Sequence, residues 1–176
     1  IRRFSLLILD NLQVKSSPRT LIKQLESAGI RPVNNLVDVT NYITLALGQP
    51  SHIFDYDKIS NHILKLRLSN KSEKITTLDH KEHTLRGGDI VLEDGSGKLI
   101  DLCGIMGGLN SEIEESTKRA VLFIQTYEPT KIRRTSLYTQ ERTLASQIFE
   151  KQPDPSLVLP AINLGIRLLK KNADAK

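Results

Sequence analysis

The sequence GIRPVNNLVDVTNY, residues 29–42, separates two helices and contains the start of the second one. Gly29 is typical of the position just after a helix, and Pro32 prevents the first helix from continuing. Apolar residues then recur in steps of three or four, so we predict a helix over residues 36–47 that Gly48 ends. A helical pair therefore organises the N-terminal part of the chain.

Upstream of this stretch, residues 4–9 read as a strand, and Ser16-Ser17-Pro18 reads as the serine-capped start of the first helix. Downstream, Gln49-Pro50 begins a loop that is expected to carry His52. The chain begins at Ile1 and enters a strand-like run almost at once. We therefore expect it to be a fragment of a larger protein.

The middle of the chain is rich in strand signals. Residues 63–68 alternate apolar and basic side chains, as a half-buried strand does. Further short strands are expected near residues 74–78, 82–85, 89–92, 98–102 and 120–126. Their spacing favours an antiparallel meander or a partly closed barrel, followed by a glycine-rich turn at residues 103–108.

The C-terminal part returns to helical periodicity over residues 131–138, 144–150 and 157–171. Asp154-Pro155 resembles a helix start, although Pro160 leaves that boundary open. The helices thus lie in the N-terminal part and at the C-terminal end, with mostly antiparallel strands between them. This order predicts an α+β fold rather than a βαβ fold.

Composition excludes several classes of protein. With 39% hydrophobic and 26% charged residues, the chain can bury a core and is not a disordered segment. Cys103 is the only cysteine, which rules out an internal disulfide or a cysteine-based zinc site and favours the cytoplasm. No apolar run is long enough to span a membrane. The net charge of +5 is compatible with a nucleic-acid partner, and equally with a charge balance of no functional weight.

Two segments resemble one known family. Residues 29–42, followed by GQPSHIFD at 48–55, are similar to the opening of the editing domain in the bacterial phenylalanyl-tRNA synthetase beta subunit. A second segment runs from GIMGG at 104–108 to RTLAS at 142–146 and is similar to the same family in order and spacing. The match covers about residues 4–171. The first segment is highly specific, whereas GIMGG alone is weak.

This resemblance implies one editing domain over residues 1–176, an α+β fold of three-layer β/β/α type. Two intertwined modules, about 1–62 plus 100–176, would surround a strand-rich insert at about 63–100. The family enzyme is a tetramer of two alpha and two beta chains that uses ATP and Mg²⁺ for aminoacylation. The resemblance implies tRNA(Phe), the alpha subunit and the rest of the beta chain as partners. It implies no cofactor or metal for this domain, whose reaction is hydrolysis of mischarged Tyr-tRNA(Phe).

The resemblance also implies roles for residues of the first segment. His52 matches the family's editing histidine and is expected to be catalytic. Arg31 matches a pocket arginine, and Asn41 lies nearby in the same motif. From the residues alone, His52 reads equally as an exposed loop histidine, and Arg31 as a member of an ordinary ion pair.

In the second segment, Thr143 and Ala145 match small residues that line the family's pocket, with Thr143 also expected to be catalytic. Gly104 and Gly107 suit close approach of the backbone to the terminal adenosine and donation of N–H groups to an oxyanion. The residues alone also allow plainer interpretations. Thr143 reads as a helix cap, and the glycines read as a tight turn between strands.

One position departs from the family pattern. Phe123 stands where the family usually has the glutamate that binds the tyrosine hydroxyl. Gln125 lies two residues on, hence on the same face of the predicted strand, and is a candidate replacement. After Ser146, the family's aromatic-Glu-Arg-Gly run is replaced by IFEKQ at residues 148–152. We therefore expect weakened editing.

The basic residues Lys131, Arg133 and Arg134 suit phosphate contacts near a helix start, or form a solvated face. Two other functions remain open. The chain reads alternatively as a structural module that supports the synthetase without editing. It also reads as a freestanding tRNA-binding or trans-editing protein.

Overall fold

Strand β9 (Ala120–Thr126) is the centre of a three-stranded antiparallel sheet in the computed structural model, which describes residues 3–176. Strands β1 (Arg3–Leu9) and β2 (Ser51–Asp55) pair with β9 on its two sides. All seven residues of β9 are buried, and β9 is the only strand of this sheet that is paired along both of its edges. The sheet belongs to a compact unit made of residues 3–55, 113–126 and 153–176, which we call the helical unit.

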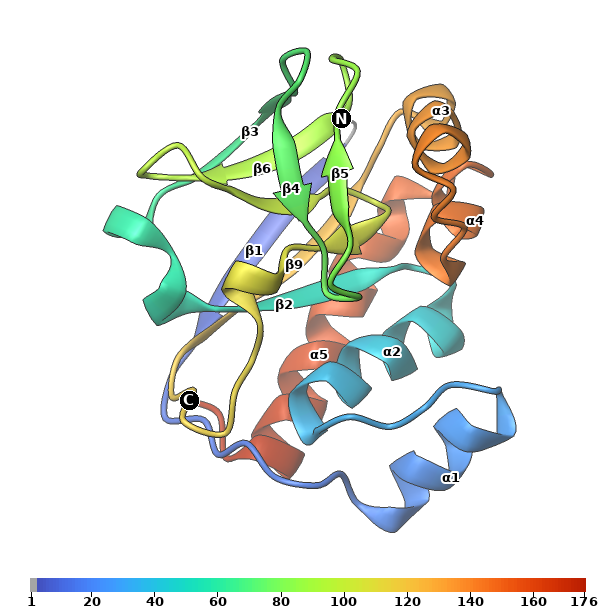
Figure 1. Cartoon of the computed structure of the whole chain (residues 1–176). Helices are drawn as coiled ribbons and strands as arrows, with labels where there is room; N and C mark the ends of the chain where they lie inside the picture. The colour runs from blue at the N-terminus through green and yellow to red at the C-terminus, as the bar shows by residue number, and fades with distance from the viewer. Residues whose placement is uncertain (1–2) are drawn as a thin grey trace. The chain divides into compact units, whose positions relative to one another are not determined.

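Helices α2 (Asn35–Leu47) and α5 (Val158–Ala173) cover one face of this sheet (Figure 1). Leu36, Ile43 and Leu122 lie in one fully buried apolar cluster with residues of α5. A Cβ atom on Gly165 would lie 2.7 Å from Cδ2 of Leu122, so the glycine allows α5 to approach the sheet closely. This cluster is the core of the helical unit.

The predicted limits of α2 are confirmed, because Gly48 ends the helix with a left-handed φ of 64°. At its start, Asn34 Oδ1 accepts hydrogen bonds from the backbone N–H groups of Leu36 and Val37. The predicted serine cap of α1 (Arg19–Ser27) is wrong, since Pro18 itself occupies the cap position. The Ser17 hydroxyl instead donates to the Asp38 carboxylate at 2.6 Å and so connects the approach to α1 with α2.

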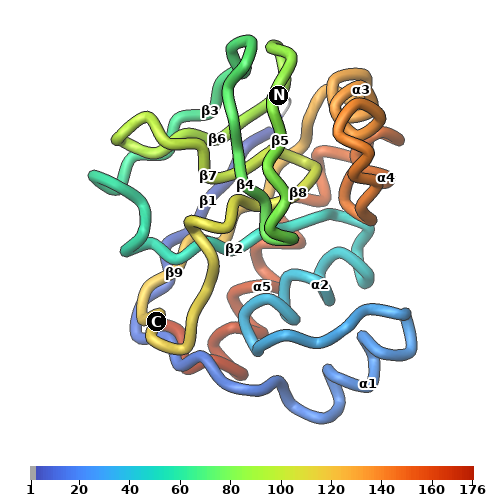
Figure 2. Tube along the Cα trace, viewed as in Figure 1, coloured from blue at the N-terminus to red at the C-terminus, as the bar shows by residue number. Residues whose placement is uncertain are grey.

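The second compact unit, residues 56–112 and 127–152, contains most of the strands, and we call it the strand-rich unit. Its four-stranded antiparallel sheet has the order β3-β6-β7-β8, and β4 and β5 pair separately (Figure 2). The bounds of these strands are Leu64–Leu68, Lys74–Thr76, Glu82–Thr84, Ile90–Asp94, Leu99–Leu102 and Met106–Gly107 for β3 to β8.

The predicted strands are present, but they do not form a simple meander. Strand β3 pairs with β6 and not with β4, because β4 and β5 form a hairpin of their own. Gly87 and Gly88 both have positive φ, 91° and 77°, and turn the chain from this hairpin back into β6. Pairing between distant strands cannot be read from spacing alone.

Two helices complete the strand-rich unit. Helix α3 (Pro129–Thr139) begins at Glu128, whose carboxylate accepts from the backbone N–H groups of Thr130 and Lys131. Helix α4 (Leu144–Phe149) is a short one capped by Thr143. Short 3₁₀ turns add to the two units at Tyr56–Lys58, Ser60–His62, Leu109–Ser111 and Pro155–Leu157.

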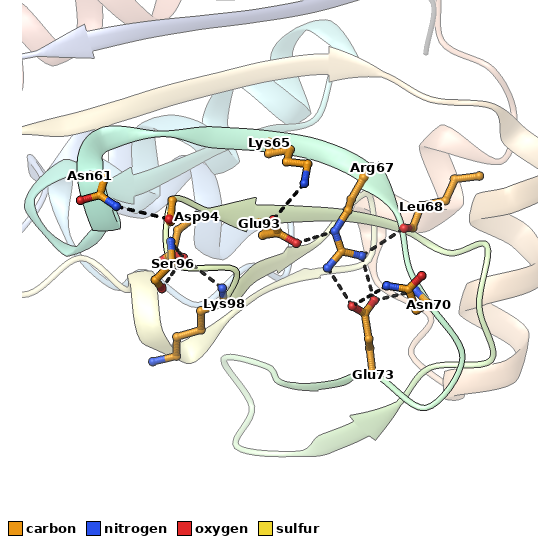
Figure 3. A network of polar contacts seen from close by, with 11 residues as sticks. Asn61, Lys65, Arg67, Leu68, Asn70, Glu73, Glu93, Asp94, Ser96 and Lys98 are labelled. Atoms are coloured by element: carbon orange, nitrogen blue, oxygen red, sulfur yellow. Dashed lines mark hydrogen bonds and ion pairs between the residues drawn. The ribbon is translucent and has the colours of Figure 1, made fainter.

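Arg67 organises a polar network on the strand-rich sheet (Figure 3). Its Nε lies 2.5 Å from Glu93 on the neighbouring strand, and its two terminal nitrogens each donate to Glu73 at 2.8 Å. The hydrogen bonds from Arg67 lower the pKa of Glu73 to about 2. The network ties the turn before β4 to the four-stranded sheet.

The predicted α+β class, with antiparallel sheets and helices near both ends, is confirmed. The division into modules at about residues 62 and 100 stays a prediction. Residues 1 and 2 of the expected first module lie outside the described residues.

Candidate functional site

His52 lies on strand β2, directly opposite Phe123 of β9. The expectation of a loop at this position is wrong, because hydrogen bonding to β9 makes residues 51–55 a strand immediately after Pro50. The imidazole packs edge to face on Phe54, with ring centroids 4.5 Å apart. Burial lowers the pKa of His52 to about 4, so the ring is neutral at pH 7 and can accept a hydrogen bond.

Phe123 and Gln125 share the sheet face on which His52 lies, since side chains alternate along a strand. Phe123 is fully buried, and its ring packs edge to face on Phe4 at 5.1 Å between centroids. Gln125 is only 3% exposed, yet its Oε1 atom has no hydrogen-bond partner among residues 3–176. A buried acceptor without a partner is costly, so this atom is suited to a hydroxyl or N–H group of a ligand.

Other members of the 29–42 motif serve the fold. Asn35 donates from Nδ2 to the carbonyls of Gln13 and Asn172, both at 2.8 Å, and joins three segments of the helical unit. Asp38 accepts from the Val33 N–H at 2.8 Å as well as from a serine hydroxyl. Much of this unusual sequence therefore builds the turn into α2.

Arg31 and Asn41 lie at opposite ends of that motif. Arg31 is exposed in the segment before α2, and among residues 3–176 it forms no ion pair. Asn41 is partly buried within α2. The ion pair that was the plainer interpretation of Arg31 is therefore not formed within the described chain.

The strand-rich unit brings Thr143 to the glycine-rich turn. Its hydroxyl donates to the carbonyl of Ile105 at 2.9 Å and accepts from the N–H of Ser146 at 3.2 Å. Thr143 is thus the N-cap of α4, as its plainer interpretation predicted, and Ala145 lies partly buried in the first turn. Both of these hydrogen bonds of the hydroxyl are made to groups within the strand-rich unit.

The two glycines of this turn have different surroundings. Gly104 has φ of 75°, and a Cβ there would lie 2.7 Å from Cδ1 of Ile132 and 3.0 Å from Cδ2 of Tyr127. Its lack of a side chain serves packing against α3. Gly107 lies on β8 opposite Asp101, and its carbonyl accepts from the N–H of Leu78 at 3.0 Å.

The basic residues of α3 have separate environments. Lys131 is partly buried, and Arg133 is exposed with a terminal nitrogen 3.9 Å from the Glu150 carboxylate. Arg134 donates to the carbonyl of Gly87 at 3.1 Å. Their role in phosphate binding stays a prediction.

The candidate residues fall into two sets. The helical unit brings together His52, Phe123 and Gln125 on one sheet face and also contains Arg31 and Asn41. The strand-rich unit contains the remaining candidates, which are Gly104, Gly107, Thr143, Ala145, Lys131, Arg133 and Arg134. A pocket shared by the two sets stays a prediction.

Sequence reasoning missed a buried carboxyl group next to the cysteine. Asp101 on β7 is 4% exposed, and burial raises its pKa to about 7 against the lowering effect of a hydrogen bond with Cys103. Burial likewise raises the pKa of the Cys103 thiol. The local signal, an aspartate inside an apolar strand, was present but does not reveal how completely the group is desolvated.

Metal ligands and membrane-spanning helices can both be recognised from the arrangement of the described residues. Within residues 3–176, no three His, Cys, Asp or Glu side chains come together as metal ligands would. In the same part of the chain, no helix combines the length and apolar character that crossing a bilayer requires.

Comparison with known proteins finds a matching family. The profile of the B3/4 domain matches residues 1–174. The phenylalanine–tRNA ligase beta subunit of Lactobacillus acidophilus is 40% identical over 173 residues, which are 98% of this chain and 21% of the relative. That of Latilactobacillus sakei subsp. sakei is 45% identical over 150 residues, 84% of this chain and 18% of the relative. The chain thus spans about a fifth of the length of these curated relatives.

A solved structure supports the fold. An N-terminal fragment of the phenylalanyl-tRNA synthetase beta subunit from Pyrococcus horikoshii superposes with a TM-score of 0.62 at 15% identity. The match covers 99% of this chain and 46% of that one. At this identity the likeness concerns the fold alone.

Proposed function

We propose an editing function for this chain, which belongs to the B3/4 domain family of the phenylalanyl-tRNA synthetase beta subunit. It would hydrolyse tyrosine wrongly esterified to tRNA(Phe), as one domain of a cytoplasmic phenylalanine–tRNA ligase. Its partners would be tRNA(Phe), the alpha subunit and the remaining beta-chain domains. ATP and Mg²⁺ would serve aminoacylation elsewhere in that enzyme, and this domain would need neither.

The need for such an activity follows from the chemistry of selection. An apolar pocket for phenylalanine rejects an analogue that merely adds a hydroxyl by only about a hundredfold. A second site must therefore bind the hydroxyl itself. A buried polar group that loses its partner when phenylalanine binds costs roughly 1–3 kcal/mol, which spares the correct product.

The observation that carries the proposal is the sheet face shared by His52, Phe123 and Gln125. A histidine that is neutral at pH 7 can accept a hydrogen bond from a water molecule and orient it towards an ester. Phe123, which stands in place of the family's glutamate, is fully buried and has no hydrogen-bond acceptor in its side chain.

Gln125 supplies the acceptor that Phe123 lacks. Its Oε1 is buried and has no partner within residues 3–176, so a tyrosine hydroxyl would satisfy it and phenylalanine would not. A neutral amide oxygen is a weaker acceptor than a carboxylate. We therefore expect slower hydrolysis of Tyr-tRNA than a glutamate at position 123 would give.

Deacylation of Tyr-tRNA(Phe) tests the proposal. Two proteins are assayed. One is a phenylalanyl-tRNA synthetase in which this chain replaces the native B3/4 domain, and the other is the 176-residue chain alone. We expect hydrolysis that falls about a hundredfold in His52→Ala and rises in Phe123→Glu. Gln125→Leu should lower the rate for Tyr-tRNA and leave the slow rate for Phe-tRNA unchanged. His80→Asn, at an exposed turn, is the matched histidine control.

A rate that is indistinguishable from spontaneous hydrolysis in both proteins would refute the editing function and favour a structural module. Hydrolysis by the 176-residue chain alone, with none in the grafted synthetase, would favour a freestanding trans-editing protein. A rate that depends on His52 but not on Gln125 would keep the catalytic role and remove the proposed hydroxyl acceptor.

A further inference from the structure

A second candidate site lies within the strand-rich unit, where the Gly87-Gly88 turn meets helix α3. It is an open cavity of about 560 Å³ lined by Arg86, Arg134, Tyr138, Leu137, Asp89 and Gln140. None of these residues belongs to the sheet face of His52. The two arginines and one carboxylate leave the lining with one net positive charge.

Arg86 is held by an aromatic ring. The central carbon of its guanidinium lies 3.8 Å from the centroid of the Tyr138 ring, and the tyrosine hydroxyl donates to the carbonyl of Thr84. Within residues 3–176, Arg86 makes no hydrogen bond or ion pair. Stacking therefore orients the guanidinium while its five N–H donors stay available to a ligand.

Arg134 lines the same cavity and is fixed by different contacts. It donates to the carbonyl of Gly87 at 3.1 Å and lies 3.6 Å from Oδ1 of Asp89. A Cβ on Gly88 would lie 3.1 Å from its Nη2 atom, so the glycine makes room for the guanidinium. About half of the Arg134 side chain remains exposed.

The carboxylate of Asp89, next to Arg134, does not remove the positive charge of the exposed lining. Asp89 is 1% exposed and already accepts from the hydroxyls of Ser69 at 3.1 Å and Thr135 at 2.7 Å. These neutral donors hold the carboxylate as an internal anchor for Arg134. The exposed part of the cavity therefore presents guanidinium donors to solvent.

We propose that this cavity binds a phosphodiester group of RNA. Guanidinium groups form strong, directional hydrogen bonds to phosphate oxygens. The face of Arg86 away from Tyr138 can additionally stack on an unpaired base. Lys131 and Arg133 lie on the same helix α3 and are further candidates for contacts to the RNA backbone. Only the choice of RNA rests on the proposed function.

Fluorescence anisotropy of a labelled RNA hairpin with an acceptor-stem sequence and a single-stranded CCA end tests this site on the 176-residue chain. Arg86→Gln should weaken binding about tenfold at low salt. It should also reduce the slope of log K against log salt by about 0.7–0.9. Arg167→Gln, an exposed arginine on α5 of the other unit, is the matched control and should change affinity less than about twofold.

Two variants of Tyr138 test whether RNA binding depends on the stacking of Arg86 on the ring or only on the positive charge of Arg86. Tyr138→Leu keeps the charge but removes the ring and should weaken RNA binding. Tyr138→Phe keeps the ring and should bind nearly as well as the parent chain. Circular dichroism and urea unfolding of each variant verify that it is folded.

Equal affinity and equal salt slope for Arg86→Gln and Arg167→Gln would overturn the proposal, as would the absence of RNA binding. Inorganic phosphate that competes as well as RNA would indicate a site for free phosphate instead. A polyglutamate peptide that binds more tightly than RNA, and depends on Arg86, would indicate an acidic protein partner. The assay is independent of catalysis, because the hairpin carries no aminoacyl ester and anisotropy reports binding alone.

Discussion

The two units of this chain bury different chemistry. The helical unit surrounds an apolar cluster, and its buried carboxylates Asp38 and Asp55 are each bonded by a neutral hydroxyl at 2.6 Å. The strand-rich unit is instead tied by charged contacts, such as Arg67 with two glutamates and Lys81 with Glu141 at 2.6 Å. Charged contacts should therefore contribute more to the stability of the second unit than to that of the first.

The largest expected effect is the loss of packing in the helical unit. Leu122 is fully buried under α5, and Leu122→Ala should lower the free energy of unfolding by about 2–5 kcal/mol. The loss should be the same at low and high salt, because no charge is involved. Urea unfolding measures it, with Leu159→Ala, which is half-exposed on α5, as the matched control. A loss below about 1 kcal/mol would contradict the assigned core.

The two units also differ at two titratable groups with shifted pKa values, one in each unit. In the helical unit, the folded pKa of His52 is about 4, below its ordinary value of 6.5. The unfolded chain therefore binds more protons between these values, and stability is lost as pH falls from 6.5 to 4. In the strand-rich unit, the folded pKa of Asp101 is about 7, above 3.8. There the folded chain binds more protons, and stability is lost as pH rises from 4 to 7.

Single substitutions should uncover these opposed slopes. His52→Gln should remove the loss towards acid, and Asp101→Asn should remove the loss towards pH 7, each worth on the order of 2–3 kcal/mol across its window. Urea midpoints between pH 4 and 7.5 measure both, and each variant is the control for the other. Two variants with slopes of the same sign would contradict the assignment.

Residue periodicity predicted those parts of the fold in which burial follows the chain locally. The limits of β9 and the end of α2 at Gly48 agree with the sequence because apolar spacing and a left-handed glycine are local signals. Strand β2 was missed, since a five-residue strand after Pro50 is defined only by its partner β9. The meander expected from the sequence agrees with the pairing of β4 with β5, but the pairing of β3 with β6, which leaves that hairpin separate, was missed because it is non-local.

The candidate site was predictable to a different degree. Resemblance to a family pointed to His52 and Thr143, and the residues alone predicted the cap role of Thr143, which is confirmed. The hydrogen bond from Thr143 to the carbonyl of Ile105 has no local signal, because the two residues are distant in sequence. The raised pKa of Asp101 and the stacking of Arg86 on Tyr138 depend on contacts between segments distant in sequence. Such properties follow from tertiary burial and have no local pattern.

A smaller effect is expected from the ionic network of the strand-rich unit. Arg67→Met should lower the free energy of unfolding by about 1–2 kcal/mol at low salt, and by less at 1 M NaCl. Arg67→Lys should recover little, since an ammonium group cannot make the bidentate contact with Glu73. Lys74→Met, which breaks the more exposed pair with Glu82, is the control and should change stability by less than about 0.5 kcal/mol. Equal losses at both salt concentrations would contradict an ionic contribution from this network.

The smallest effect concerns the cap of α4, and it separates structure from catalysis. Thr143→Ala should cost about 1 kcal/mol of stability, whereas Thr143→Ser keeps the hydroxyl that bonds Ile105 and Ser146 and should cost little. Urea unfolding measures the cap, and Tyr-tRNA(Phe) deacylation per folded molecule measures catalysis. Because both contacts of this hydroxyl are internal, deacylation by the alanine variant should change only as far as α4 is displaced. A specific rate that is lost in Thr143→Ala and kept in Thr143→Ser, at equal folded fraction, would instead show that the hydroxyl takes part in the reaction. Thr143 would then share the catalytic role with His52.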